Sequence, residues 1–209
     1  MNLEKAVEQL KKGGMIVVYD GDEREGEADL MFSARFAEPR KVQILRKEAG
    51  GLICAAIPEE EAGEIGLPFF TDILEKADTG VKSITCTKTA YGDKPAFSLP
   101  VNHCEVYTGI TDNDRALTLK KLDEIVRERK GDFTREFYAP GHIFLLIGRG
   151  LDKRKGHTEL ALELGKRADQ KVMVLCEMLG HGRAISKAEA KEYAHWNGMP
   201  FVEGKELFE

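Results

Sequence analysis

The sequence lacks the features that mark membrane and secreted proteins. Its 209 residues contain only four cysteines and one tryptophan, and no apolar run approaches the roughly 18 residues that a membrane span needs. The cysteines are scattered and form no CxxC pair, so neither a disulfide scaffold nor a CxxC redox site is expected. The first fourteen residues are amphipathic and include acidic side chains, unlike a signal or transit peptide. We therefore expect a cytosolic protein with reduced thiols.

The chain also has no basic block. Lysine and arginine number 31 against 36 aspartates and glutamates, which gives a net charge of −5. Nucleic acid is therefore not expected as the main partner, because phosphate backbones require clustered cations. Hydrophobic residues make up 42% and charged residues 32%, as in ordinary globular proteins. The length and the absence of a linker or repeat predict one domain over residues 1–209.

Helical and strand patterns alternate along the chain. Apolar residues at helical spacing predict helices over 3–12, 38–50, 114–130, 158–168 and 186–197. Continuous apolar runs predict buried strands over 15–19, 52–57, 142–148 and 171–177, with weaker strand patterns over 97–101 and 104–107. The segment 69–95 has no clean period and is expected to be irregular. This alternation predicts an α/β protein, a three-layer α/β/α fold with a mixed β-sheet.

An acidic segment, residues 20–29, directly follows the first predicted strand. It carries six carboxylates in ten residues. Such a cluster repels itself, and a bound divalent cation would stabilise it. The segment is not an EF-hand, because Arg24 occupies a ligand position. An acidic surface loop explains the same pattern equally well.

A basic segment precedes the helix predicted at 158–168. Arg154 and Lys155 lie beside Gly156, where the free N–H groups and the dipole of a helix N-terminus favour an anion such as phosphate. His157 could bind a metal or transfer a proton. The alternative is a basic loop in which Thr158 caps the helix.

Two further residues stand at the ends of buried strands. His142 follows a Pro-Gly turn at the start of one strand, and Glu177 ends another. Burial raises the pKa of a carboxyl group, so Glu177 is a candidate proton donor or acceptor. A structural histidine and simple strand termination are the alternatives. The hydroxyl and acidic residues of 107–115 would either cap the next helix or bind a polyol.

Taken together, these segments resemble the 3,4-dihydroxy-2-butanone 4-phosphate synthase family of the riboflavin pathway. The matching segments occur in the family's order along nearly the whole chain: 22–29, 50–54, 108–118, 140–142, 156–159 and 176–177. Gly26 and Ala28 depart from the family's Asn and Gly in the acidic segment. The set is far more specific than any single motif.

The resemblance implies conversion of D-ribulose 5-phosphate to 3,4-dihydroxy-2-butanone 4-phosphate and formate. It implies a Mg²⁺ or Mn²⁺ cofactor bound by Glu25 and His157, and catalysis by His142 and Glu177. It also implies a homodimer with sites near the interface. The positions that match substrate-binding residues are Arg24, Glu25, Asp29, Cys54, Thr108, Arg154, Lys155, Gly156, His157 and Thr158.

Two other functions remain compatible with the residues alone. A metal-dependent sugar-phosphate isomerase or aldolase would share the metal and phosphate sites but would release no formate. A non-catalytic nucleotide- or RNA-binding domain could share the three-layer architecture, since fold alone does not determine function. The absence of a basic patch counts against the second.

Overall fold

The computed structural model describes residues 2–86, 88–89, 92–129 and 131–208, and its centre is a mixed β-sheet. Seven strands pair in the order β4-β5-β3-β6-β2-β1-β7. The pairs β3/β5 and β1/β7 are parallel and the others are antiparallel. The strands are β1 Ile16–Tyr19, β2 Ala28–Ser33, β3 Cys54–Pro58, β4 Phe97–His103, β5 Phe137–Gly148, β6 Met173–Glu177 and β7 Phe201–Glu203.

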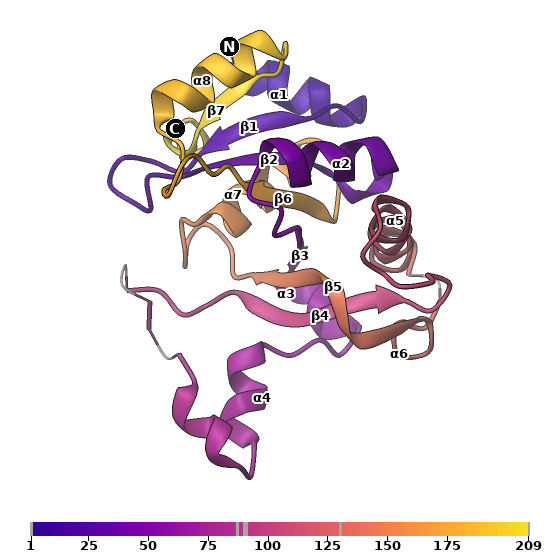
Figure 1. Cartoon of the computed structure of the whole chain (residues 1–209). Helices are drawn as coiled ribbons and strands as arrows, with labels where there is room; N and C mark the ends of the chain where they lie inside the picture. The colour runs from indigo at the N-terminus through magenta and orange to yellow at the C-terminus, as the bar shows by residue number, and fades with distance from the viewer. Residues whose placement is uncertain (1, 87, 90–91, 130, 209) are drawn as a thin grey trace.

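Helices cover both faces of this sheet (Figure 1). The helices α1 Asn2–Lys11 and α7 His157–Arg167 pack on one face, together with the short helix η3 Gly204–Leu207. The other face is covered by α2 Pro39–Glu48, α3 Glu59–Glu64, α5 Asp112–Glu128 and α8 Lys187–Trp196. This arrangement confirms the predicted three-layer α/β/α architecture. Within the described residues, no helix is both long and apolar enough to cross a bilayer.

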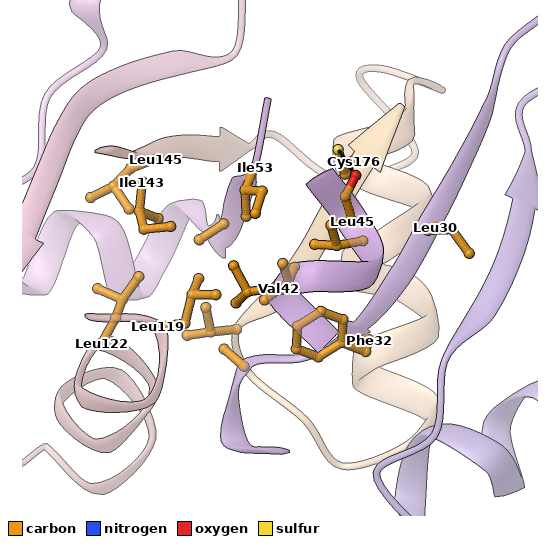
Figure 2. Packing of buried hydrophobic residues seen from close by; sticks show 14 of the residues in the cluster. Leu30, Phe32, Val42, Leu45, Ile53, Leu119, Leu122, Ile143, Leu145 and Cys176 are labelled. Atoms are coloured by element: carbon orange, nitrogen blue, oxygen red, sulfur yellow. Dashed lines mark hydrogen bonds between the residues drawn. The ribbon is translucent and has the colours of Figure 1, made fainter. Parts of the chain in front are cut away.

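The larger hydrophobic core lies between the sheet and the pair α2 and α5. Val42 and Leu45 of α2 meet strand side chains such as Phe32, as Figure 2 shows. Leu45 and Phe32 are both fully buried. Alternation along the strands sends Leu30 and Phe32 to this core and Met31 to the core under α7. Residues of β2 and β6 pack in both cores, which fixes the ends of these strands, where Asp29 and Glu177 lie.

One strand expected from the sequence is absent from the described residues, and two observed strands were not predicted. Residues 104–107 form no strand, because β4 ends at His103 and Val106 N donates to His103 O across a turn at 3.2 Å. Strand β2 was missed because all six of its residues are buried and contain no β-branched side chain. Strand β7 has only three residues, too few to produce a pattern.

The segment 69–95, expected to be irregular, contains two short helices. These are α4 Phe70–Lys76 and η2 Gly80–Ile84, and neither contributes a buried residue. In Figure 1 the part with α4 and η2 projects away from the sheet. The remaining helices are also short, α6 Phe133–Glu136 and η1 Ala34–Phe36.

Replacing Leu45 by alanine should leave a cavity between α2 and the sheet. We expect Leu45→Ala to lower the free energy of unfolding by about 3 kcal/mol, from lost burial and an unfilled cavity. The control is Val81→Ala in η2, where the side chain is 43% exposed, with a change within about 0.5 kcal/mol. Urea denaturation measures both, and equal effects would contradict the packing described.

Candidate active site

The acidic segment between β1 and β2 is organised by its first residue, Asp20. One carboxylate oxygen accepts from Gly21 N at 2.7 Å and from Glu27 N at 3.0 Å, and the other accepts from Glu25 N at 2.9 Å. Charge-assisted bonds of this kind are stronger than neutral ones. Gly26 adopts φ +70°, which L side chains rarely adopt. The loop is therefore folded around the Asp20 carboxylate and is not merely a solvated turn.

His157, the first residue of α7, faces this loop. Its Nε2 atom lies 3.2 Å from Asp29 Oδ2 and 3.2 Å from the carbonyl oxygen of Glu27, with Asp20 Oδ1 at 3.9 Å. A bare nitrogen lone pair would be repelled by these oxygens, so a proton or a metal ion must lie among them. Side-chain donor atoms of Asp20, Glu25 and His157 all lie within 4.8 Å of one another. This nitrogen-and-carboxylate donor set suits a divalent metal such as Mg²⁺ or Mn²⁺.

A cavity of about 420 Å³ opens beside this cluster. It is lined by seven of the residues singled out in the sequence: Glu25, Asp29, Cys54, Arg154, His157, Thr158 and Glu177. Strand pairing explains part of this gathering, because Asp29 of β2 is directly opposite Glu177 of β6. The cavity therefore joins the acidic segment, the basic segment and the end of a buried strand.

Three carboxyl groups in this region, those of Glu27, Asp29 and Glu177, hold protons more tightly than free ones. Burial, reinforced by neighbouring carboxylates, raises the pKa of Glu27 to about 7 and that of Asp29 to about 6. Burial also raises the pKa of Glu177, with Glu25 adding to the effect. Burial of the His157 ring lowers its pKa, but Asp29 and Asp20 outweigh this and raise it overall. Groups that hold protons near neutral pH are suited to proton transfer.

An anion-binding arrangement lies on the basic side of the cavity. Arg154 is 9% exposed and its guanidinium pairs with the fully buried carboxylate of Glu159 at 2.7 Å. Gly156 is required beside it, because a Cβ there would overlap the Arg154 guanidinium. Arg24 Nη2 and Arg154 Nη2 each lie 3.8 Å from Glu25 Oε1. The two guanidiniums thus meet at the same carboxylate.

Lys155 and Cys54 have less direct positions. The Lys155 ammonium lies over the Phe208 ring, 4.6 Å from its centroid, and Lys155 does not line the cavity. Cys54 does line the cavity, but burial raises the pKa of its thiol. A neutral thiol is a weak nucleophile, so Cys54 shapes the wall of the cavity and is not suited to nucleophilic attack.

His142 and Thr108 lie outside the cavity, and His142 contacts Asn102 of β4. The Asn102 side chain accepts from His142 N at 2.9 Å and lies 3.2 Å from His142 Nδ1. A Cβ on Gly109, next to Thr108, would overlap this same side chain. The strand of His142, β5, is two strands from that of Glu177, a spacing of about 10 Å. Within one chain, Glu177 lines the cavity and His142 does not.

Sequence reasoning did not single out Asp20, Glu27 or Asp93 as site residues. Asp20 and Glu27 lie within the acidic segment. Its six carboxylates look alike in the sequence, so a residue that orders the loop cannot be distinguished there from one that binds metal. Asp93 lies in the segment expected to be irregular, yet its carboxylate pairs with Arg24 at 2.9 Å and Arg154 at 3.3 Å. No sequence pattern indicated that contact.

The metal-free protein should lose stability as the pH rises from about 4 to about 7. Folding raises the pKa of Glu27 and of Asp29 from 4.5 and 3.8 to about 7 and 6, so the folded state binds more protons than the unfolded state in this window. Rising pH therefore favours unfolding. Urea denaturation in the presence of a chelator measures the slope, which Glu27→Gln should reduce. A stability that rises through this window would contradict the assignment.

Comparison with known proteins identifies the family. The family model described as 3,4-dihydroxy-2-butanone 4-phosphate synthase matches residues 4–209. A protein of that name from Archaeoglobus fulgidus is 39% identical over all of this chain and 93% of its own length. Membership of this family decides against both an isomerase or aldolase and a non-catalytic binding domain.

Solved structures agree with the sequence match. The 3,4-dihydroxy-2-butanone 4-phosphate synthase of Candida albicans superposes with a TM-score of 0.79 at 26% identity, covering 99% of this chain and 95% of that one. Another synthase structure, described as a complex with two magnesium ions, superposes with a TM-score of 0.77 at 26% identity, covering 98% and 94%. The chain therefore belongs to the 3,4-dihydroxy-2-butanone 4-phosphate synthase family, the riboflavin-pathway lyases that convert D-ribulose 5-phosphate to 3,4-dihydroxy-2-butanone 4-phosphate and formate.

Proposed function

We propose that Glu25 and His157 hold the divalent metal of this synthase. The observation that carries the proposal is the convergence of the Glu25 carboxylate and the His157 ring on one cavity, with the Asp20 carboxylate beside them. The bound metal would supply a Lewis acid that polarises the carbonyl and hydroxyl oxygens of the sugar. The related structure with two magnesium ions supports Mg²⁺, although the donor atoms suit Mn²⁺ equally well.

The phosphate of ribulose 5-phosphate is assigned to Arg24, Arg154 and the N-terminus of α7. Residues 156–158 begin this helix, and Gly156 leaves its first N–H groups without a side-chain cap. The Glu159 carboxylate accepts from Arg154 Nη1 and fixes the position of this guanidinium. Phosphate is remote from the reacting carbons, so these contacts bind and orient the substrate. Thr158, Asp29 and Cys54 complete the wall on the sugar side.

Proton transfers are assigned to Glu177 and His142. The reaction requires enolisation, loss of the C1 hydroxyl, skeletal rearrangement and formate release, and the first two of these move protons. Glu177 lines the cavity and burial raises its pKa above the usual range of a carboxyl group, which makes it a stronger proton acceptor than a free carboxylate. His142 is oriented by Asn102, which contacts both its backbone N–H and its ring. All substrate atoms are recovered in the two products, so no oxidant is needed.

His142 and Thr108 are assigned to the site of a second copy, in a two-fold homodimer. Both lie near Asn102, outside the cavity that holds the remaining site residues. The surface around them exposes Tyr107 at 95%, Ile110 at 51% and Tyr138 at 43%. Exposed apolar groups of this kind are typical of an interface, and two-fold symmetry is the commonest arrangement.

The remaining features of the proposal concern the protein as a whole. We assign residues 1–209 to one synthase domain, since one family model covers 4–209. A cytosolic location accords with a charged sugar phosphate, which cannot cross an apolar bilayer unaided.

Glu25→Gln should weaken metal binding and activity together. The change keeps the size of the side chain but removes its charge, so we expect Mn²⁺ affinity to fall at least about ten-fold. Electron paramagnetic resonance of free Mn²⁺ measures binding, and formate released from ribulose 5-phosphate measures activity. Glu23→Gln is the matched control, because Glu23 is an exposed residue of the same loop. Equal Mn²⁺ binding by both variants would remove Glu25 from the metal site.

Mixing Glu25→Gln and His142→Ala chains should restore activity. If each site takes Glu25 from one chain and His142 from the other, one of the two sites in every heterodimer is intact. Random reassociation after joint unfolding should then recover about a quarter of the wild-type activity. A mixture of Glu25→Gln and His157→Ala is the control, because both residues line the same cavity.

Two outcomes would contradict the shared site. Activity of the first mixture that stays at the background of the single variants would show that Glu25 and His142 act within one chain. Sedimentation of the wild-type protein as a monomer at micromolar concentration would reject the dimer itself.

A further inference from the structure

One carboxylate from outside the acidic segment lies between the two arginines of the anion site. Asp93 Oδ2 is 2.9 Å from Arg24 Nη2 and 3.3 Å from Arg154 Nε. Asp93 belongs to the stretch between η2 and β4, 69 residues from Arg24 in sequence. A single oxygen atom thus contacts both guanidiniums, as one oxygen of a bound phosphate would.

Hydrogen bonds fix the backbone of Asp93 and of the residues that follow it. Thr89 N donates to Asp93 O at 2.8 Å, and Asp93 N donates to the Thr89 hydroxyl at 3.2 Å. Just beyond, Arg149 donates to the carbonyl oxygens of Lys94 at 3.3 Å and Pro95 at 3.1 Å. Thr89 and Pro95 both line the cavity. These contacts fix the backbone of Asp93 beside the cavity, and none of them uses its carboxylate.

Carboxylates already pair with both arginines. Glu25, Asp93 and Glu159 all lie within 4 Å of Arg24 or Arg154, three carboxylates against two guanidiniums. A phosphate monoester brings a further charge of about −1.5 to −2 at neutral pH. A bound phosphate would therefore compete with these carboxylates for the two guanidiniums.

Asp93 is the carboxylate that can withdraw. The Glu159 carboxylate is fully buried in α7 and also accepts from Arg149 N at 3.1 Å. If it moved away, the Arg154 guanidinium would lose its buried partner, which is costly. Glu25 belongs to the metal-binding group. Asp93 lies on a turn outside the regular elements, and its side chain is 23% exposed.

We propose that Asp93 is an internal substitute for the phosphate group of the substrate. In the empty site its carboxylate holds Arg24 and Arg154 together, and the substrate's phosphate displaces it on binding. When the product, which also carries a phosphate, leaves, Asp93 returns to the arginines and limits how tightly that product is held. This inference rests on the assignment of the two arginines to the phosphate.

The test is the affinity for inorganic phosphate, measured by isothermal titration calorimetry of the full chain with a fixed concentration of Mg²⁺. Asp93→Asn removes the competing charge, so we expect phosphate to bind about five-fold more tightly than to the wild type. The KM for ribulose 5-phosphate should fall in the same direction. The matched control is Asp78→Asn, an exposed aspartate of the same segment, with an affinity within about two-fold of wild type.

Two further variants separate the possible failures. Arg154→Ala should weaken phosphate binding, and Asp93→Ser should repeat the gain of Asp93→Asn with a smaller side chain. If Arg154→Ala weakens binding but both Asp93 variants bind phosphate no better than wild type, Asp93 merely positions the arginines and the inference is wrong. If Arg154→Ala binds phosphate as the wild type does, the phosphate assignment itself fails and the inference falls with it.

Discussion

Mutual repulsion among carboxylates is the constraint on which this site depends. Five acidic side chains surround a single imidazole at the edge of the sheet: Asp20, Glu25, Glu27, Asp29 and Glu177. The fold tolerates them because backbone N–H groups neutralise part of the charge on Asp20 and because several carboxyl groups hold protons near neutral pH. A divalent cation would neutralise the remainder. The same repulsion would therefore favour the binding of a divalent cation.

Sheet topology brings these charges together. Strand β2 lies between β1 and β6, antiparallel to both, so the acidic segment that leads into β2 lies beside the end of β6. Helix α7 covers the same face of the sheet, and its first residue, His157, contacts the loop. Glu159, two residues further along this helix, fixes Arg154. One helix end thus connects the cation-binding and anion-binding parts of the cavity.

The β4/β5 edge of the sheet leads to residues that this cavity does not include. His142 and Thr108 gather near Asn102, close to an exposed apolar surface. In the proposed dimer these residues would come from a second copy, so catalysis would depend on assembly as well as on folding. Exposed aromatic residues such as Tyr107 and Tyr138 are explained more simply by such a contact than by solvent exposure.

The sequence by itself determined the layer architecture, most of the elements and the family. Helix α5 was predictable because its buried residues recur at helical spacing, and β6 because its residues form a continuous apolar run. It missed β2, whose two buried faces remove the alternation that identifies a strand, and β7, which is too short to produce one.

The candidate site divides in the same way. Glu25 could be selected because it matches a metal-ligand position of the family, and His157 and Arg154 also because they lie in a basic segment before a helix. The tertiary structure places all three around one cavity. Only the tertiary structure distinguished Asp20, which organises the loop, from its acidic neighbours, and only it brought Asp93 to the two arginines across 69 residues of chain. Contacts of that separation depend on how the sheet and its connections pack, which no local pattern of residues encodes.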